Sequence, residues 1–173
     1  MGNQRATKKY CEGSCWVNGQ EQGLSASETS LLEWLRDLLA ITDVRKGCDS
    51  GHCGSCAVVF DGQAVKACSI LASDASGRTI FSLKGLPLLK DPVIDSILSA
   101  EQRLQPFQCA YCKPAFMLAA YELLRYNSEP TAAQIKQQFS GLLCRCTGYQ
   151  SIVMMVLSAA EQLGNMPEEE CDA

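Results

Sequence analysis

The stretch KGCDSGHCGSC, residues 46–56, decides what this chain can be, because it gathers three cysteines around the chain's only histidine. Such a loop can hold a disulfide, a zinc ion, a redox dithiol or an iron–sulfur cluster. The 173 residues include eleven cysteines. In a reducing compartment disulfides are rare, so clustered thiols there usually bind metal or carry out redox chemistry.

Composition and charge describe an ordinary globular protein. Hydrophobic residues make up 47% of the chain, as in a folded protein. The formal net charge is -4, which does not favour binding to nucleic acid, so proteins are the expected partners. The first ten residues, MGNQRATKKY, contain no apolar signal core, and no later stretch approaches about eighteen apolar residues. We therefore expect a cytoplasmic protein that makes no contact with membranes.

The residues before the cysteine loop predict a hairpin and a helix. An Asn-Gly pair at 18–19 is a tight-turn signal and indicates a hairpin over residues 16–24. The segment SLLEWLRDLLA, residues 30–40, predicts an amphipathic helix that begins with a capping box of Ser30 and Glu33. Its five leucines are expected on one buried face.

The residues after the loop continue as strands and then change to a helical period. An Asp-Gly pair at 61–62 joins a second hairpin that delivers Cys68, and a last strand is expected over 79–83. Helices are predicted from Asp91 as N-cap, over 114–126, from Thr131 with Gln134 in a capping box, and through 152–164. We expect an α+β fold with domains at 1–88 and 89–165, followed by an acidic tail at 166–173.

The first set of cysteines has the spacing of a plant-type [2Fe–2S] ferredoxin. Three of them follow the pattern C-x4-C-x2-C, and a fourth closes the set after eleven intervening residues. Gly47, Gly51 and Gly54 suit such a loop, since glycine allows positive φ and close approach of backbone amides. A zinc site usually takes two closely spaced pairs, and here the first gap is four residues. The predicted ligands are Cys48, Cys53, Cys56 and Cys68.

The second set of cysteines is ambiguous when it is taken alone. Cys109 and Cys112 form a C-x2-C pair, and Cys144 and Cys146 form a C-x-C pair after an intervening helical segment. Two sulfurs at each of two helix junctions can clamp one inorganic centre. The spacing fits a structural zinc ion as well as it fits an iron–sulfur cluster.

A resemblance separates these alternatives. The segments GCDSGHCGSCAVVFDGQAVKAC, QCAYCKPAF and LLCRCTGY resemble the small, two-cluster [2Fe–2S] subunit of the xanthine dehydrogenase family of molybdenum hydroxylases, over nearly the whole chain. The resemblance implies a β-grasp, ferredoxin-like domain followed by a four-helix bundle. It assigns the first set of cysteines to an outer cluster that faces a flavin subunit. It assigns Cys109, Cys112, Cys144 and Cys146 to an inner cluster.

The resemblance also implies partners and an activity. A large subunit would hold molybdopterin, with Gln108 and Cys146 beside the pterin, and a medium subunit would hold FAD. Electrons would pass from molybdenum through the inner and outer clusters to FAD, in a heterotrimer or a dimer of heterotrimers. The substrate is expected to be xanthine or hypoxanthine, with aldehydes, nicotinate, other N-heterocycles and carbon monoxide as alternatives. This chain alone would catalyse no reaction on an organic substrate.

Some residues depart from the family pattern or stand outside both sets. Ala110 replaces a usual glycine, and Lys113 adds a positive charge that is expected to raise the potential of the inner cluster. His52 is interpreted as an exposed loop side chain, because a Rieske centre needs two histidines. The cysteines outside the two sets are expected to be loose thiols on terminal segments. They are Cys11, Cys15 and Cys171.

Two other classes of protein are alternatives to the electron-transfer subunit. A free-standing ferredoxin would carry electrons without fixed partners, although it has no need of the second cysteine set. A zinc-stabilised interaction module would be colourless and redox-silent. Co-purification with two larger subunits would exclude the free-standing ferredoxin, and a coloured, redox-active protein would exclude the zinc module.

Overall fold

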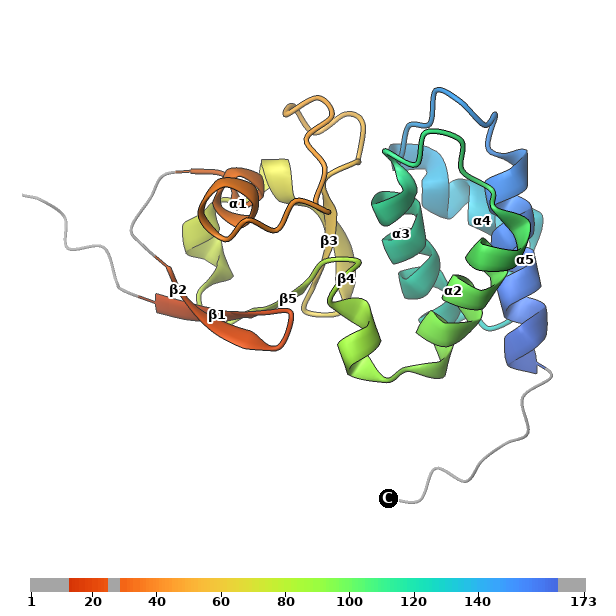
Figure 1. The fold of residues 1–173 in the computed structure, drawn as a ribbon, viewed down its shortest axis with the longest axis horizontal. Coiled ribbons are helices and arrows are strands. Elements are labelled where there is room, and N and C mark those ends of the chain that lie inside the picture. The colour runs from red at the N-terminus through yellow and green to blue at the C-terminus, as the bar shows by residue number, and fades with distance from the viewer. Residues whose placement is uncertain (1–12, 25–28, 165–173) are drawn as a thin grey trace, which may run out of the picture.

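The N-terminal half of the chain is built on a mixed five-stranded sheet (Figure 1). The structure, a computed structural model, describes residues 13–24 and 29–164. The strands lie in the order β2-β1-β5-β3-β4; β1 runs parallel to β5, and the other neighbours are antiparallel. Both predicted hairpins are present. The strands are β1 (Gly13–Val17), β2 (Gln20–Leu24), β3 (Ala57–Phe60), β4 (Gln63–Lys66) and β5 (Thr79–Phe81).

The predicted leucine-rich helix forms, but only its first turn is α-helical. The α1 helix (Leu31–Glu33) is capped by Ser30, whose hydroxyl accepts from the Glu33 N–H at 3.2 Å, and it continues as a π-helix over Trp34–Leu38. The wider π turn moves Leu38 out of the buried stripe, and its side chain is 60% exposed. The prediction that all five leucines are buried is therefore wrong at Leu38.

Cys15 is a core residue and not a loose thiol. It lies on β1 and is fully buried, while its neighbour Trp16 points to solvent, because successive residues of a strand face opposite sides. Burial raises the pKa of the Cys15 thiol to about 11. The sequence prediction for Cys15 is wrong, since the hairpin begins earlier than residue 16. Cys11, Cys171 and the acidic tail at 166–173 lie outside the described residues.

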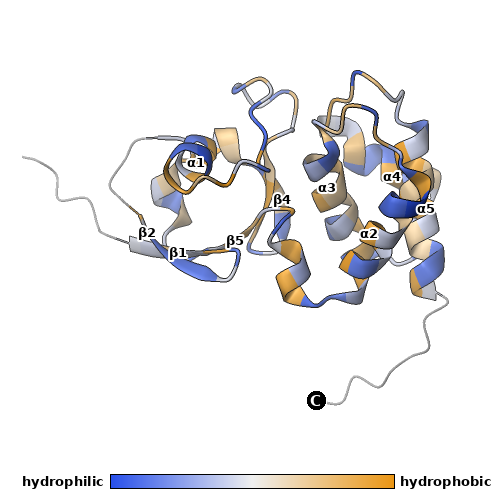
Figure 2. Cartoon of the chain, viewed as in Figure 1, coloured by the Kyte–Doolittle hydropathy of each residue, from blue (hydrophilic) through white to orange (hydrophobic). Residues whose placement is uncertain are grey.

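The C-terminal half is helical, as predicted. Asp91 caps the first helix by accepting from the Val93 N–H at 2.9 Å, and Thr131 and Gln134 form the expected capping box. Figure 2 shows hydrophobic and hydrophilic residues together on α2 and α5, as in helices with one buried face. The helices are α2 (Pro92–Leu104), α3 (Lys113–Tyr126), α4 (Ala132–Gln138) and α5 (Gln150–Gly164).

Two hydrophobic cores lie on either side of the sheet strand β3. Val58 faces the core beneath α1, and Val59 faces the core of the helical half, where α3 packs against β3. The predicted α+β fold is confirmed, while the limits at residues 88 and 165 stay a prediction. No helix in the described ranges has the length and apolar character needed to cross a membrane.

Candidate metal centres

Three cysteine-bearing loops project from the same end of the molecule (Figure 1). The first joins the π-helical turn to β3, the second joins α2 to α3, and the third joins the end of α4 to α5. Cys68 lies in a 3₁₀ turn, Ala67–Ser69, directly after β4. The fold therefore places eight predicted ligands, distant in sequence, at one end.

The outer set is arranged as two neighbouring pairs of cysteines. The Cys53 N–H donates to the Cys48 sulfur at 3.3 Å, and this bond, with further bonds from Ser50, lowers the pKa of Cys48 to about 6. Burial raises the pKa of Cys56 to about 12, and its thiol hydrogen-bonds with that of Cys68. Hydrogen bonds thus favour the thiolate form of Cys48, and burial favours the neutral thiol of Cys56.

The predicted glycines of the outer loop serve two different purposes. Gly51 and Gly54 have φ of +76° and +70°, which an L-residue adopts only with strain. Gly47 instead permits close approach, because a Cβ there would lie 2.7 Å from the Cys53 sulfur. Sequence reasoning did not single out Lys66, whose ammonium donates to the Gly51 carbonyl at 2.8 Å and holds the loop against β4.

The inner set is also arranged as two pairs. The Cys146 and Cys109 sulfurs are 3.6 Å apart, and the thiols of Cys112 and Cys144 are hydrogen-bonded. Burial raises the pKa of Cys112 to about 12. Burial acts in the same direction on Cys144, but hydrogen bonds from the Thr147 hydroxyl and two backbone amides outweigh it and lower the pKa of Cys144.

This pairwise arrangement fits two irons in each set. Two sulfurs on one tetrahedral metal, each about 2.3 Å from it, lie about 3.8 Å apart, and the Cys109–Cys146 pair is close to that separation. Within residues 13–24 and 29–164, no three His, Cys, Asp or Glu side chains gather around a point as one metal ion requires. The donor set of each loop system is thus four thiols in two pairs.

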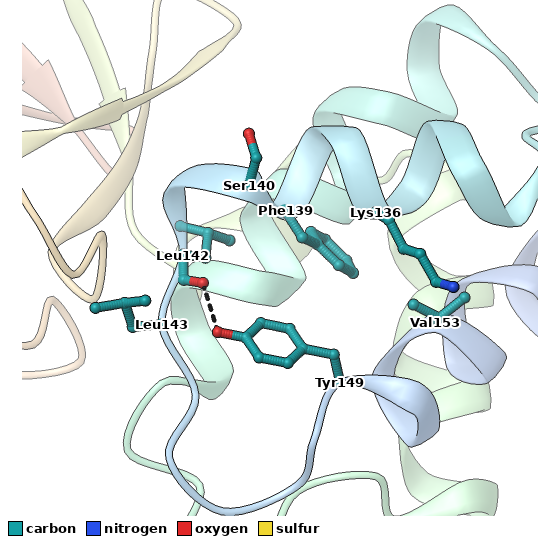
Figure 3. Close-up of a pocket in the computed structure, with 7 residues that line it drawn as sticks. All are labelled: Lys136, Phe139, Ser140, Leu142, Leu143, Tyr149 and Val153. Carbon is teal, nitrogen blue, oxygen red and sulfur yellow. Dashed lines mark hydrogen bonds between the residues drawn. The ribbon is translucent and has the colours of Figure 1, made fainter.

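Tyr149 supports the inner loop from behind. Its hydroxyl accepts from the Cys144 N–H at 3.1 Å. It also donates to the Leu142 carbonyl at 3.1 Å, the bond that Figure 3 shows. The ring packs edge-on against Phe116 at 5.8 Å between centroids. It also borders a mainly apolar cavity of about 280 Å³. The cavity is lined by Lys136, Phe139, Ser140, Leu142, Leu143, Tyr149 and Val153.

The outer and inner loops touch each other directly. The Leu143 N–H donates to the Cys53 carbonyl at 2.9 Å, which joins the residue before an inner ligand to an outer ligand. A second bond runs from the Tyr111 hydroxyl to the Lys46 carbonyl at 2.7 Å, and the Arg45 guanidinium lies 5.6 Å from the Tyr111 ring centre. The two predicted centres are therefore parts of one continuous structure.

The other predicted site residues are placed as follows. Gln108 and Cys146 are both exposed on the inner loops. His52 is exposed, as expected, and its Nδ1 lies 3.1 Å from the Ser50 hydroxyl. Ala110 has φ +57°, so the usual glycine is replaced where the backbone is left-handed. The Lys113 ammonium is not free, because it lies 2.8 Å from a Glu101 carboxylate oxygen.

Two family models match the chain. The model described as 2Fe-2S iron-sulfur cluster binding domain matches residues 25–102, and the model described as [2Fe-2S] binding domain matches residues 89–157. Together with the two sets of paired thiols, these matches define a protein with two [2Fe–2S] binding domains.

Relatives of known function give the family. The chain is 39% identical over 151 residues to the nicotine 6-hydroxylase small subunit of Paenarthrobacter nicotinovorans, covering 86% of this chain and 89% of that protein. It is 36% identical over 146 residues to the xanthine dehydrogenase iron-sulfur-binding subunit of Escherichia coli O157:H7, covering 83% and 90%. Quinoline 2-oxidoreductase from Pseudomonas putida 86 is 27% identical with a TM-score of 0.78, over 90% of this chain and 98% of the matched chain. The chain belongs to the family of small two-[2Fe–2S] subunits of molybdenum hydroxylases.

Proposed function

We propose that this chain carries electrons between two partner subunits of a heteromeric molybdenum hydroxylase and has no catalytic activity on an organic substrate alone. A large partner would hold molybdopterin and a medium partner would hold FAD. The first partner delivers electrons to the inner set and the second receives them from the outer set. When bound, each [2Fe–2S] cluster takes up and releases one electron. The proposed ligands are Cys48, Cys53, Cys56 and Cys68 for the outer cluster, and Cys109, Cys112, Cys144 and Cys146 for the inner cluster.

The observation that carries this proposal is the bond between the two ligand loops. From the Cys144 sulfur the covalent chain leads to the Leu143 N–H, and one 2.9 Å hydrogen bond leads on to the carbonyl of Cys53. Both ends of this path are proposed ligands. Electron transfer between two sites is favoured by a continuous bonded path. Two independent structural metal sites would not require such a path.

The exposure of the two sets supports a position between partners. Cys109 and Cys146 are exposed on the inner side, next to the exposed Gln108, and Cys48 is exposed on the outer side. We propose that Gln108 and Cys146 contact the pterin of the large subunit and that the outer loop faces the flavin subunit. The complex would be a cytoplasmic heterotrimer or a dimer of heterotrimers.

The substrate belongs to the large partner, and we propose an N-heterocycle. The support is that relatives of similar identity are named for nicotine and xanthine, and the matched structure is named for quinoline. Within this class, xanthine or hypoxanthine remains our specific prediction, and a pyridine such as nicotine is the second candidate. Turnover of each by the purified complex distinguishes them.

Metal analysis tests the two-cluster assignment. Anaerobically purified protein is assayed for iron, acid-labile sulfide and zinc, and an EPR spectrum is recorded after dithionite reduction. We expect about four irons and four sulfides per chain and two distinct [2Fe–2S] signals. Zinc without a signal would refute the proposal in favour of a structural module. Two signals without co-purifying large and medium subunits would favour a free-standing ferredoxin.

A single substitution tests the relay itself. Cys144→Ser should abolish flavin reduction by substrate in the assembled complex and leave the EPR signal of the outer cluster intact. Cys171→Ser is the control, because Cys171 belongs to neither set, and it should leave both signals and flavin reduction unchanged. Normal flavin reduction in Cys144→Ser would exclude the inner set from the electron path.

A further inference from the structure

Lys113 and Glu101 form a partly buried ion pair whose lysine is next in sequence to a proposed inner ligand. Lys113 is the first residue of α3 and directly follows Cys112, and Glu101 lies in the last turn of α2. Their charged atoms are 2.8 Å apart, and the side chains are 30% and 14% exposed. The surface pair of Arg78 and Asp61, by contrast, is 56% and 38% exposed.

Because the pair is partly buried, its charges can affect the reduction potential of a nearby cluster. Solvent screens exposed charges strongly and partly buried charges much less. The cluster proposed here becomes more negative when it is reduced, so a nearby cation favours the reduced form and a nearby anion favours the oxidised form. The two members of the pair therefore act in opposite directions on the same reduction.

The neighbouring Arg103 does not compete for this carboxylate in the described hydrogen bonds. It is on α2 two residues beyond Glu101, and its guanidinium donates to the Ser158 hydroxyl on α5. The ammonium of Lys113 is therefore the cation that meets Glu101. An unpaired lysine at this position would leave one net positive charge beside the ligand Cys112.

We propose that Glu101 is a positioning residue and counter-charge that holds down the reduction potential of the inner cluster by neutralising Lys113. This inference rests on the proposed function, since it requires a cluster at the inner set. It changes the interpretation of Lys113. The lysine raises the potential and the carboxylate lowers it, so the pair as a whole leaves the potential nearly unchanged.

The test is the midpoint potential of each cluster in the assembled complex, measured by an EPR-monitored redox titration. Glu101→Gln leaves Lys113 unpaired and should raise the ratio of reduced to oxidised inner cluster about tenfold at a fixed potential, or about 59 mV. Lys113→Met should lower that ratio by a similar factor. The double variant should return to within about twofold of the wild type. The outer cluster serves as an internal reference, and its midpoint potential should not change.

Two further variants separate charge from structure. Glu101→Asp keeps the charge and should stay within about twofold of the wild-type ratio. Glu129→Gln removes an exposed carboxylate beyond the end of α3 that is opposite to Cys112, and it should change neither potential. The inference is overturned if Glu101→Gln leaves the inner potential unchanged, or if Glu101→Asp shifts it as much as Glu101→Gln. A wild-type protein without a second EPR signal would instead refute the proposed function on which the inference rests.

Discussion

Replacing Gly54 by alanine tests how closely the two ligand loops approach each other. Gly54 has φ +70°, and a Cβ there would lie 2.7 Å from the Gly141 carbonyl oxygen and would also meet the Leu142 side chain. A left-handed backbone costs an L-residue about 1–2 kcal/mol. Pushing the opposing backbone away should add roughly 1–3 kcal/mol, as overpacking does in cores. We expect Gly54→Ala to lower the free energy of unfolding by about 2–5 kcal/mol.

The matched control for this substitution is Gly62→Ala. Gly62 has φ +87°, and no heavy atom lies within 4 Å of its would-be Cβ, so alanine there incurs backbone strain without a contact. Thermal unfolding of the cluster-loaded protein compares the two variants. In a chain of this size about 1 kcal/mol corresponds to roughly 2–4 °C. Gly54→Ala should therefore lose roughly 2–12 °C more than Gly62→Ala.

A second measurement connects the contact to the relay. Alanine at residue 54 pushes the 141–143 segment away and should lengthen the bond from the Leu143 N–H to the Cys53 carbonyl. Flavin reduction by substrate should then slow in Gly54→Ala and stay normal in Gly62→Ala. If both variants lose the same stability and both transfer electrons normally, the close approach of the loops is wrong and so is the path drawn through it.

Two further predictions concern side chains on either side of this contact. Tyr149→Phe removes the acceptor for the Cys144 N–H and the donor to Leu142, so it should cost about 1–3 kcal/mol and hasten loss of the inner EPR signal on heating. Tyr126→Phe, at a side chain 75% exposed, is the control and should change neither; equal behaviour of the two would show that Tyr149 does not support the loop. The raised pKa of Cys15, about 11, predicts a dependence on alkaline pH. The unfolded thiol ionises near pH 8.5 and the buried one does not, so this stabilisation is present at lower pH and is lost as pH rises toward 11, by at most about 1.4 kcal/mol per pH unit. Denaturant unfolding from pH 8 to 11 should show a shallower loss in Cys15→Ala than in the wild type, and identical slopes would contradict the burial of a neutral thiol.

Local sequence patterns predicted the parts of this molecule that depend on near neighbours. The caps at Ser30, Asp91 and Thr131 all form, because a cap satisfies backbone groups within three residues of itself. The spacing of the first cysteine set matched a loop that the structure closes around two pairs of thiols. These features could be recognised from one segment at a time.

The features that the sequence did not reveal are contacts between distant segments. Lys113 looked like a free cation because Glu101, its partner, is twelve residues earlier on another helix. Cys15 looked like a terminal thiol because its burial depends on a core that it shares with residues distant in sequence, such as Leu31 of α1 and Ile80 of β5. Leu38 follows the helical pattern of its neighbours, and only the π turn displaces it. For Lys113 and Cys15 the missing information was tertiary, whereas for Leu38 it was the local backbone form of the helix.

Main-chain atoms make the hydrogen bond between Leu143 and Cys53, so substitutions at Leu143 should leave this bond intact. The donor at Leu143 and the acceptor at Cys53 are backbone groups, so the bond does not depend on the side chain at 143, which is 56% exposed. Residue 54 has no such freedom, because a single added carbon would meet the opposing backbone. The spacing of the two sets therefore rests on a main-chain bond and a glycine, together with the side-chain bond from Tyr111 to the Lys46 carbonyl. The proposed effect of the Lys113–Glu101 pair on the inner cluster therefore requires no change in the distance between the two sets.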